Sequence, residues 1–173
     1  WIRRFQNMAQ YFDAYRIDHV LGFFRIWEIP VNAVHGLLGQ FQPSLGMTRE
    51  EIESYGLSFL EHQFCDPFIA NWVLDRIFHE RADEVKTKYL DYDHDDIWKL
   101  KPAYDTQRKI EKAFDGVTDE HELHLRDGLY SLVSDVLFVR DHKDNSKFHP
   151  RISAQFNFTY EALYDNDKAA FNR

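Results

Sequence analysis

The chain carries, from Phe12 to Pro30, the stretch FDAYRIDHVLGFFRIWEIP, and the pattern of apolar side chains changes within it. Residues 14–18 alternate as in a short strand, and an apolar run follows at residues 20–24. The opening dozen residues predict an amphipathic helix, because their apolar side chains recur at helical spacing: Ile2, Phe5, Met8, Tyr11 and Phe12. A helix followed by a strand and a loop is the order of an α/β unit.

Two charged residues of this stretch are candidates for chemistry. Arg16 and Asp18 are two positions apart, so on a strand their side chains point to the same face. The positive charge of an arginine favours the ionised form of a neighbouring aspartate. At the carboxyl end of a barrel strand, an oriented carboxylate of this kind suits the nucleophile of a retaining glycosidase. A structural ion pair at a strand end gives the same pattern, so that alternative stays open.

The same stretch resembles the nucleophile-strand segment of the 4-α-glucanotransferases, the amylomaltases or disproportionating enzymes of glycoside hydrolase family 77. The resemblance rests on Arg-Ile-Asp-His at residues 16–19, the Gly-Phe pair that follows, and Trp-Glu-Ile-Pro at residues 27–30. Where the common bacterial form has Phe-Arg before the glycine, this chain has Val-Leu, which resembles the subgroup that includes the plant cytosolic enzyme. Similarity to this subgroup covers essentially the whole chain and is sharpest over residues 12–30 and 36–56.

The resemblance implies a parent enzyme with a (β/α)8 barrel that moves α-1,4-glucan units between maltodextrins with retention. Asp18 falls on the nucleophile that would form the glucosyl-enzyme ester, and Arg16 falls on the arginine that orients and ionises it. His19 falls on a histidine that would contact the bound sugar by a hydrogen bond. The implied partners are maltose, maltodextrin or other α-glucans, from starch or glycogen, and neither a cofactor nor a metal is implied. The family's acid/base and transition-state motifs do not occur in this sequence, so we expect the segment alone to be inactive.

We expect a mostly α chain in two parts. Residues 1–30 would be a helix-strand fragment of the catalytic barrel that carries the nucleophile strand, and residues 31–173 would be a mostly helical insertion. The chain begins at Trp1 and stops at Arg173 within helical patterns, which predicts an internal segment of a longer polypeptide. The apolar face of the first helix would then lie against the insertion or a second copy, which would give a homo-oligomer of the fragment.

Local signals predict the helices of the insertion. A capping box at Thr48 and Glu51, with Gly56 as the stop, predicts one short helix. Asp66 before Pro67 predicts the start of a longer helix that runs on to residue 89. The remaining predicted N-caps are Asp105, with Gly116 closing its helix, then Thr118 and Thr159.

Other stretches have weaker signals. Residues 136–139 are open between a helix end and a strand, and residues 141–150 predict a charged loop. Residues 91–96 have the acids of a calcium loop at its first three ligand positions, but lack the glycine at the sixth, which favours a solvated acidic loop. A histidine pair three residues apart, His121 and His124, has no third metal ligand in the sequence pattern, which favours exposed histidines. Trp98 follows the acidic stretch and is interpreted as an exposed aromatic residue that contacts glucan.

The net charge of −8, from 21 basic and 29 acidic residues, disfavours nucleic acid and other polyanions as partners. We expect no membrane partner, because no apolar run approaches the roughly 20 residues of a membrane span. The single cysteine, Cys65, predicts a buried small side chain and favours a cytoplasmic location. The alternative to a catalytic role is a non-catalytic helical interaction or acceptor-positioning module.

Overall fold

The computed structural model describes all 173 residues apart from the side chain of Phe23. The helices are α1 (Ile2–Met8), α2 (Arg49–Ser54), α3 (Glu61–Cys65), α4 (Asn71–Phe78), α5 (Ala82–Tyr89), α6 (Gln107–Ala113), α7 (Glu120–Val133), α8 (Phe158–Glu161) and α9 (Asp165–Phe171). The 3-10 helices are η1 (Val20–Phe23), η2 (Gly36–Leu38), η3 (His79–Arg81) and η4 (Ala154–Phe156). The strands are β1 (Ile26–Glu28), β2 (Gln40–Gln42), β3 (Met47–Thr48), β4 (Leu90–His94), β5 (Ile97–Leu100), β6 (Phe138–Arg140) and β7 (Lys147–Pro150). Helix predominates, so the expectation of a mainly helical chain is confirmed.

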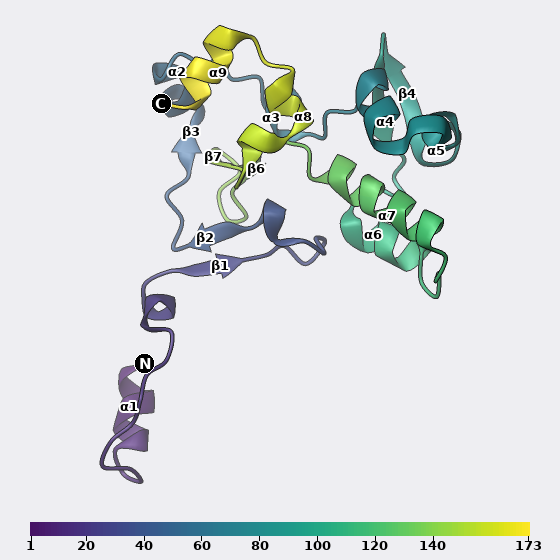
Figure 1. Cartoon of the computed structure of the whole chain (residues 1–173). Helices are drawn as coiled ribbons and strands as arrows, with labels where there is room; N and C mark the ends of the chain where they lie inside the picture. The colour runs from purple at the N-terminus through teal and green to yellow at the C-terminus, as the bar shows by residue number, and fades with distance from the viewer.

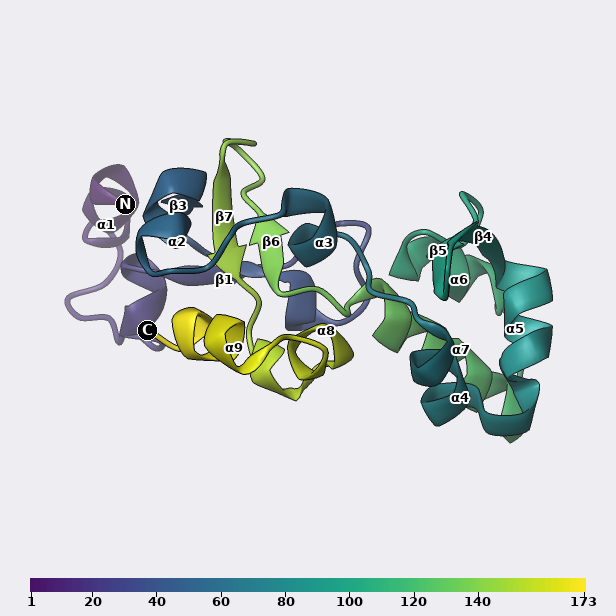
Figure 2. The same cartoon turned by 90° about the horizontal axis from the view of Figure 1, so that it is seen from above.

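Two lobes, each with its own hydrophobic core, form the body of the molecule (Figure 2). In the first lobe, helices α4 to α7 and the β4–β5 hairpin enclose a core that includes Ile69, Val73 and Leu129. In the second lobe, helices α2, α3 and α9 contribute to a core around Phe59 and Phe148. The sheet of this lobe is antiparallel, in the order β3-β7-β6. The chain passes from the second lobe to the first and back. Contacts between residues that are far apart in the sequence therefore hold the second lobe together.

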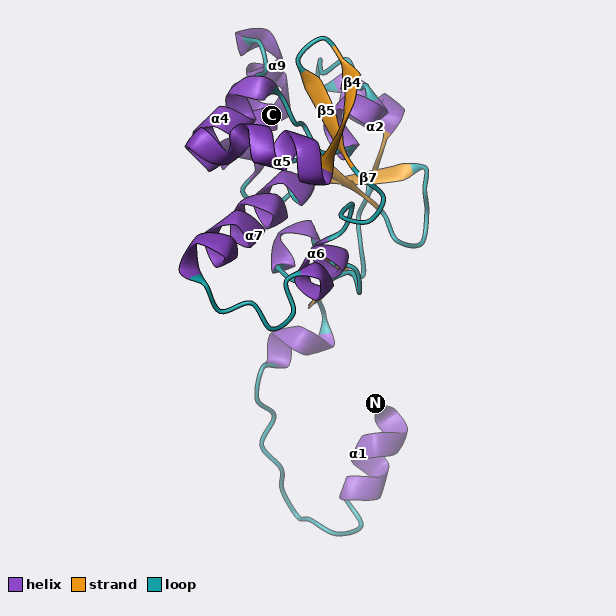
Figure 3. Cartoon of the chain, turned by 90° about the vertical axis from the view of Figure 1, so that its right-hand side faces the viewer, coloured by secondary structure: helices purple, strands orange, loops and turns teal.

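The N-terminal segment stands apart from both lobes (Figures 1 and 3). Helix α1 forms where its apolar spacing predicts, but it ends at Met8 and none of its residues is buried. The ring of Phe5 stacks on that of Tyr15, with the centroids 5.3 Å apart. The expected packing of this helix against the insertion is therefore wrong for this structure. Residues 14–18 are also not a strand, because a strand needs a paired neighbour to complete its main-chain hydrogen bonds, and the first paired residue is Ile26.

Helix α2 follows the local sequence closely. The Thr48 backbone N–H donates to Glu51 Oε2 at 2.8 Å, and the Glu51 N–H donates to Thr48 Oγ1 at 3.3 Å. Gly56 then takes a φ of 95°, beyond the helix end. The predicted capping box and stop are both confirmed.

Later helices begin at caps other than the predicted ones. Thr106, Asp119 and Asn157 accept from the backbone N–H of the third helical residue, in place of Asp105, Thr118 and Thr159. Helix α4 begins at Asn71, not after Pro67, because the Phe68 N–H donates to the Asp135 carbonyl and the Trp98 N–H donates to the Ile69 carbonyl. The expected single helix to residue 89 is two helices, broken at His79 with a φ of 50°.

The acidic stretch is a hairpin and not a loop, so that prediction is wrong. Strands β4 and β5 pair antiparallel, with Leu90 opposite Leu100 and Tyr92 opposite Trp98. The rings of Tyr92 and Trp98 meet edge to face at 5.7 Å, which supports the pairing. The sequence left residues 136–139 open between a helix end and a strand, and the structure forms strand β6 there. Strand β7 lies within residues 141–150, which were predicted to be a charged loop.

A buried carboxylate lies where the chain returns from the first lobe to the second. Asp135 is 3 % exposed and accepts from the backbone N–H groups of Phe158 at 3.0 Å and Thr159 at 2.8 Å. It also accepts from the Thr159 hydroxyl. Burial raises the pKa of Asp135 even though these hydrogen bonds oppose the shift. Next to it, the Leu137 N–H donates to the Phe64 carbonyl at 2.8 Å, so two chain crossings are joined at this point.

We predict that Asp135→Ala lowers the free energy of unfolding of the chain by about 2 kcal/mol, because the backbone N–H groups of Phe158 and Thr159 and the Thr159 hydroxyl lose their acceptor. Urea unfolding followed by circular dichroism measures the change. The control is Asp75→Ala on the exposed face of α4, which should stay within about 0.5 kcal/mol of the wild type. Equal effects of the two substitutions would contradict the assigned role of Asp135.

Candidate active site

The two residues predicted for catalysis, Arg16 and Asp18, and the predicted sugar contact, His19, lie between α1 and η1. Arg16 Nε lies 3.1 Å from Asp18 Oδ1, and the two side chains are 89 % and 72 % exposed. His19 has a left-handed backbone, with a φ of 54°, and is the N-cap of η1. The structure thus brings Arg16 and Asp18 together, although they lie in a loop and not on a strand. The arrangement offers an oriented carboxylate on an open surface.

Large apolar side chains before and after this ion pair in the sequence are also exposed. They include Tyr11, Phe12, Tyr15, Ile17, Val20, Leu21 and Phe24. An ion pair in water contributes little to stability, and a nucleophilic carboxylate gains strength when solvent is excluded. The Asp18 carboxylate therefore lies, open to solvent, in a segment whose large apolar side chains are uncovered in this chain.

Strands β1 and β2 connect this loop to the rest of the molecule. Trp27 lies opposite Phe41 in the antiparallel pair, and its indole Nε1 donates to the Gly36 carbonyl at 3.0 Å. Gly39 is required here, because a Cβ at this position would collide with the Trp27 ring. The guanidinium of Arg25 lies 4.1 Å from the centroid of the Phe41 ring. The β1–β2 pair, called the ribbon below, is thus held by aromatic contacts. The first of them involves Arg25, seven residues after Asp18.

The loop between β1 and β2 is attached to the first lobe by Gln107. This side chain is fully buried, and its Oε1 accepts from the backbone N–H groups of Val34 at 2.8 Å and His35 at 2.9 Å. Its Nε2 donates to the Tyr130 carbonyl at 3.1 Å. One amide therefore connects this loop to both α6 and α7.

The residues after β2 are attached to the second lobe by Asp141, whose side chain is 2 % exposed. Asp141 Oδ2 lies 2.8 Å from both Ser44 Oγ and His149 Nε2. Its Oδ1 accepts from the backbone N–H groups of Lys143 and Asp144. Burial opposes ionisation, but these hydrogen bonds, with His149 first among them, outweigh it and hold the pKa of Asp141 well below its usual value.

Sequence reasoning did not find these buried polar anchors. Nothing near Asp141 or Gln107 in the sequence distinguishes them from exposed residues, since the partners through which they anchor the residues around β2, Ser44 for Asp141 and Val34 for Gln107, are about 70 to 100 positions away. Cys65 is buried as predicted, and desolvation raises the pKa of its thiol to about 12, which makes it a poor nucleophile. His121 and His124 are exposed, as expected. Within the described residues, no group of three His, Cys, Asp or Glu side chains is arranged to hold a metal ion.

None of the helices in the described part of the chain is both long enough and apolar enough to cross a membrane.

Comparison with known proteins identifies the family. A family model described as 4-alpha-glucanotransferase matches residues 1–127. The chain belongs to the 4-alpha-glucanotransferase family. It is 33 % identical over its whole length to the 4-alpha-glucanotransferase DPE2 of Oryza sativa subsp. japonica, and it spans 19 % of the length of that protein.

A second glucanotransferase shares a shorter region. The chain is 37 % identical over 46 residues to the chloroplastic/amyloplastic 4-alpha-glucanotransferase of Solanum tuberosum, which is 27 % of this chain and 8 % of that protein. No solved structure matches the chain. The family resemblance inferred from residues 12–30 is confirmed by these matches.

The depressed pKa of Asp141 predicts a pH-dependent contribution to stability. This contribution is present above the unfolded pKa of an aspartate, about 3.9, and is lost as the pH falls through and below that value. We expect Asp141→Asn to lower the free energy of unfolding by about 2 kcal/mol at pH 7, and by less at pH 3. Urea unfolding at both pH values measures this, with Asp75→Asn as the exposed control. A difference that is unchanged between pH 7 and pH 3 would rule out the ionised network.

Proposed function

We propose that the full-length protein transfers α-1,4-glucan units between maltodextrins with retention, through a covalent glucosyl ester on Asp18. The observation that carries this proposal is the 3.1 Å ion pair between Arg16 and Asp18 within the FDAYRIDH stretch of a chain that belongs to this family. Maltose is included among the substrates because of the resemblance to the subgroup with the plant cytosolic enzyme. The same resemblance supports a cytoplasmic location.

The mechanism uses Asp18 as nucleophile. Its carboxylate attacks the anomeric carbon of the donor, the glycosidic bond breaks, and the leaving 4-hydroxyl takes a proton from a separate acid. The 4-hydroxyl of an acceptor glucan then attacks the ester, gives its proton to the same group, and releases Asp18. Arg16 holds the carboxylate ionised and oriented, and His19 contacts the sugar. Two displacements at one carbon retain its configuration.

We assign residues 1–30 to the catalytic barrel and residues 31–173 to an insertion. Support comes from the distribution of apolar side chains. Both hydrophobic cores are made by residues after residue 33, whereas exposed large apolar residues are dense before residue 32. The remaining barrel strands of the parent are a suitable cover for that exposed surface, in place of a homo-oligomer of the fragment.

A non-catalytic role of the insertion is the second proposal. Because residues 33–173 build two cores of their own, they have the organisation of a separate module that positions acceptor glucan or binds a partner. This role and catalysis by Asp18 are compatible within one parent protein.

We expect Asp18→Asn in the full-length protein to lower glucan transfer by at least about a thousandfold, because an amide does not form the glucosyl ester. Chromatography of the products from maltose and maltotriose measures glucose and longer maltodextrins. The matched control is Asp13→Asn, an exposed aspartate of the same loop, which should leave transfer unchanged. A folded Asp18→Asn protein with wild-type transfer would remove Asp18 from the mechanism.

We also predict that the 173-residue chain alone transfers no glucan. A single carboxylate does not supply both the nucleophile and the acid, and the Asp18 side chain is 72 % exposed to water. Incubation of the purified chain with maltotriose, followed by the same chromatography, checks this. Product formation by the chain would contradict the requirement for a second carboxylate from the rest of the protein.

A further inference from the structure

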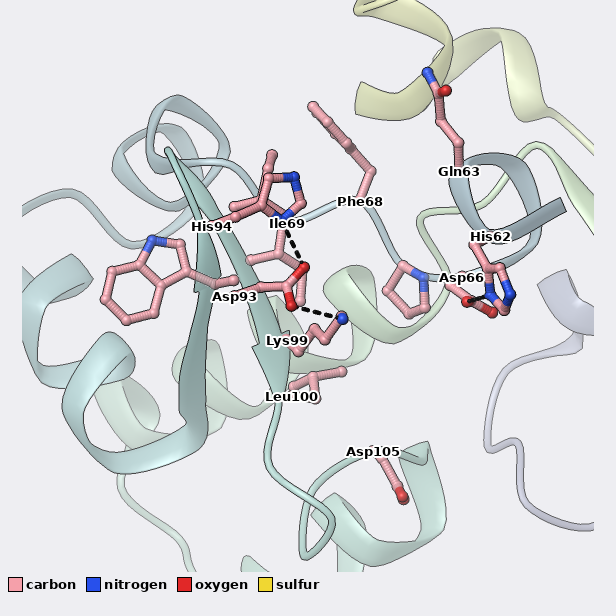
Figure 4. Close-up of a pocket in the computed structure, with 13 residues that line it drawn as sticks. His62, Gln63, Asp66, Phe68, Ile69, Asp93, His94, Lys99, Leu100 and Asp105 are labelled. Atoms are coloured by element: carbon pink, nitrogen blue, oxygen red, sulfur yellow. Dashed lines mark hydrogen bonds and ion pairs between the residues drawn. The ribbon is translucent and has the colours of Figure 1, made fainter. Parts of the chain in front are cut away.

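A pocket of about 650 Å³ lies between the β4–β5 hairpin and the segment that joins the two lobes (Figure 4). Its volume is within the range of small-molecule sites, about 300–1,000 Å³. Its apolar lining consists of Pro67, Phe68, Ile69, Ile97, Trp98 and Leu100. Neither Arg16 nor Asp18 belongs to the lining, so the pocket is separate from the proposed nucleophile.

The carboxylates of the pocket wall already have cationic partners. The pairs are Asp93 with Lys99 at 2.7 Å, Asp66 with Arg140 at 2.9 Å, and Asp105 with Lys109 at 2.6 Å. His94 Nδ1 also lies 2.7 Å from Asp93, and His62 Nδ1 lies 3.0 Å from Asp66. The negative charges of these carboxylates are therefore already compensated, so the pocket wall does not attract a cationic ligand through them.

A neutral ligand with many hydroxyl groups suits these walls. A hydroxyl can donate to a carboxylate of an ion pair and accept from its ammonium group, so the pair need not be broken. Figure 4 shows the Asp93–Lys99 pair on the hairpin and Phe68 and Ile69 on the facing segment. The Phe68 side chain is half-buried, which leaves part of its ring available to the C–H face of a sugar.

We propose that this pocket is a second glucan site, which binds a short run of α-linked glucose units at a distance from Asp18. The choice of an α-glucan rests on the proposed function, whereas the preference for a neutral polyhydroxyl ligand rests on the pocket alone. Asp93 and Lys99 bind hydroxyl groups, and Phe68 supports the ring. The half-buried Trp98 contributes to the lining through its packing, since its indole N–H already donates to Asn71 Oδ1.

Hydrogen–deuterium exchange of the full-length protein, with and without maltoheptaose, tests the site locally. We expect slower exchange in peptides that cover residues 62–69 and 91–100. In Lys99→Met, which keeps most of the side-chain length, the maltoheptaose concentration for half-maximal protection should rise about tenfold. Asp93→Asn should act in the same direction. The control is Lys112→Met, an exposed lysine of α6 outside the pocket lining.

The outcomes separate this site from the proposed function. Protection that weakens in Lys99→Met and Asp93→Asn, with transfer between maltose units unchanged, supports the pocket. Protection of these peptides without any transfer products keeps the pocket and overturns the proposed activity. Transfer activity without protection of these peptides overturns the pocket, as does protection that is equal in the wild type and both pocket variants.

Discussion

Three donors from the start of α8 converge on the buried carboxylate of Asp135, where the chain leaves the first lobe and enters the second. The backbone of the same residue accepts from Phe68, on the segment that crosses in the other direction. Buried polar groups without partners are costly, so this set of bonds allows few alternative arrangements of the lobes. Apolar contact reinforces the junction, because Phe158 meets Trp72 of the first lobe edge to face. The wall of the pocket that carries Phe68 is therefore held by the backbone carbonyl of the same residue, Asp135.

The segment that carries the proposed nucleophile depends on a different set of anchors. Gln107 attaches the β1–β2 loop to the first lobe, and Asp141 attaches the residues after β2 to the second. The ribbon that follows Asp18 is thus held by both lobes, whereas the loop that carries Arg16 and Asp18 has an exposed ion pair and few buried contacts. This contrast fits a catalytic segment whose own neighbours belong to the rest of a longer protein.

A polymer-modifying enzyme benefits from holding its substrate at more than one point, since binding at a remote site adds to affinity without changing the reacting atoms. The pocket beside the β4–β5 hairpin and the Asp18 carboxylate lie in separate parts of the chain. The β1–β2 pair and the junction of the two lobes at Asp135 connect them. Under the proposed function, the insertion would bind substrate while the barrel carries out the chemistry. The two functions proposed for the parent, transfer and acceptor positioning, are then properties of one assembly.

Local sequence determined the elements whose signals are short-range. The capping box at Thr48, the glycine stop at residue 56 and the Arg16–Asp18 proximity all involve residues a few positions apart, and the family was evident from residues 12–30. The tertiary structure alone decided the start of α4, the hairpin at residues 91–100 and the burial of Asp135 and Asp141. Each of these depends on hydrogen bonds or ring contacts between side chains or strands that meet only in the folded chain, which periodicity and capping signals do not contain. The strand expected at residues 14–18 was wrong for the same reason, because strand pairing is a property of the neighbour as much as of the sequence.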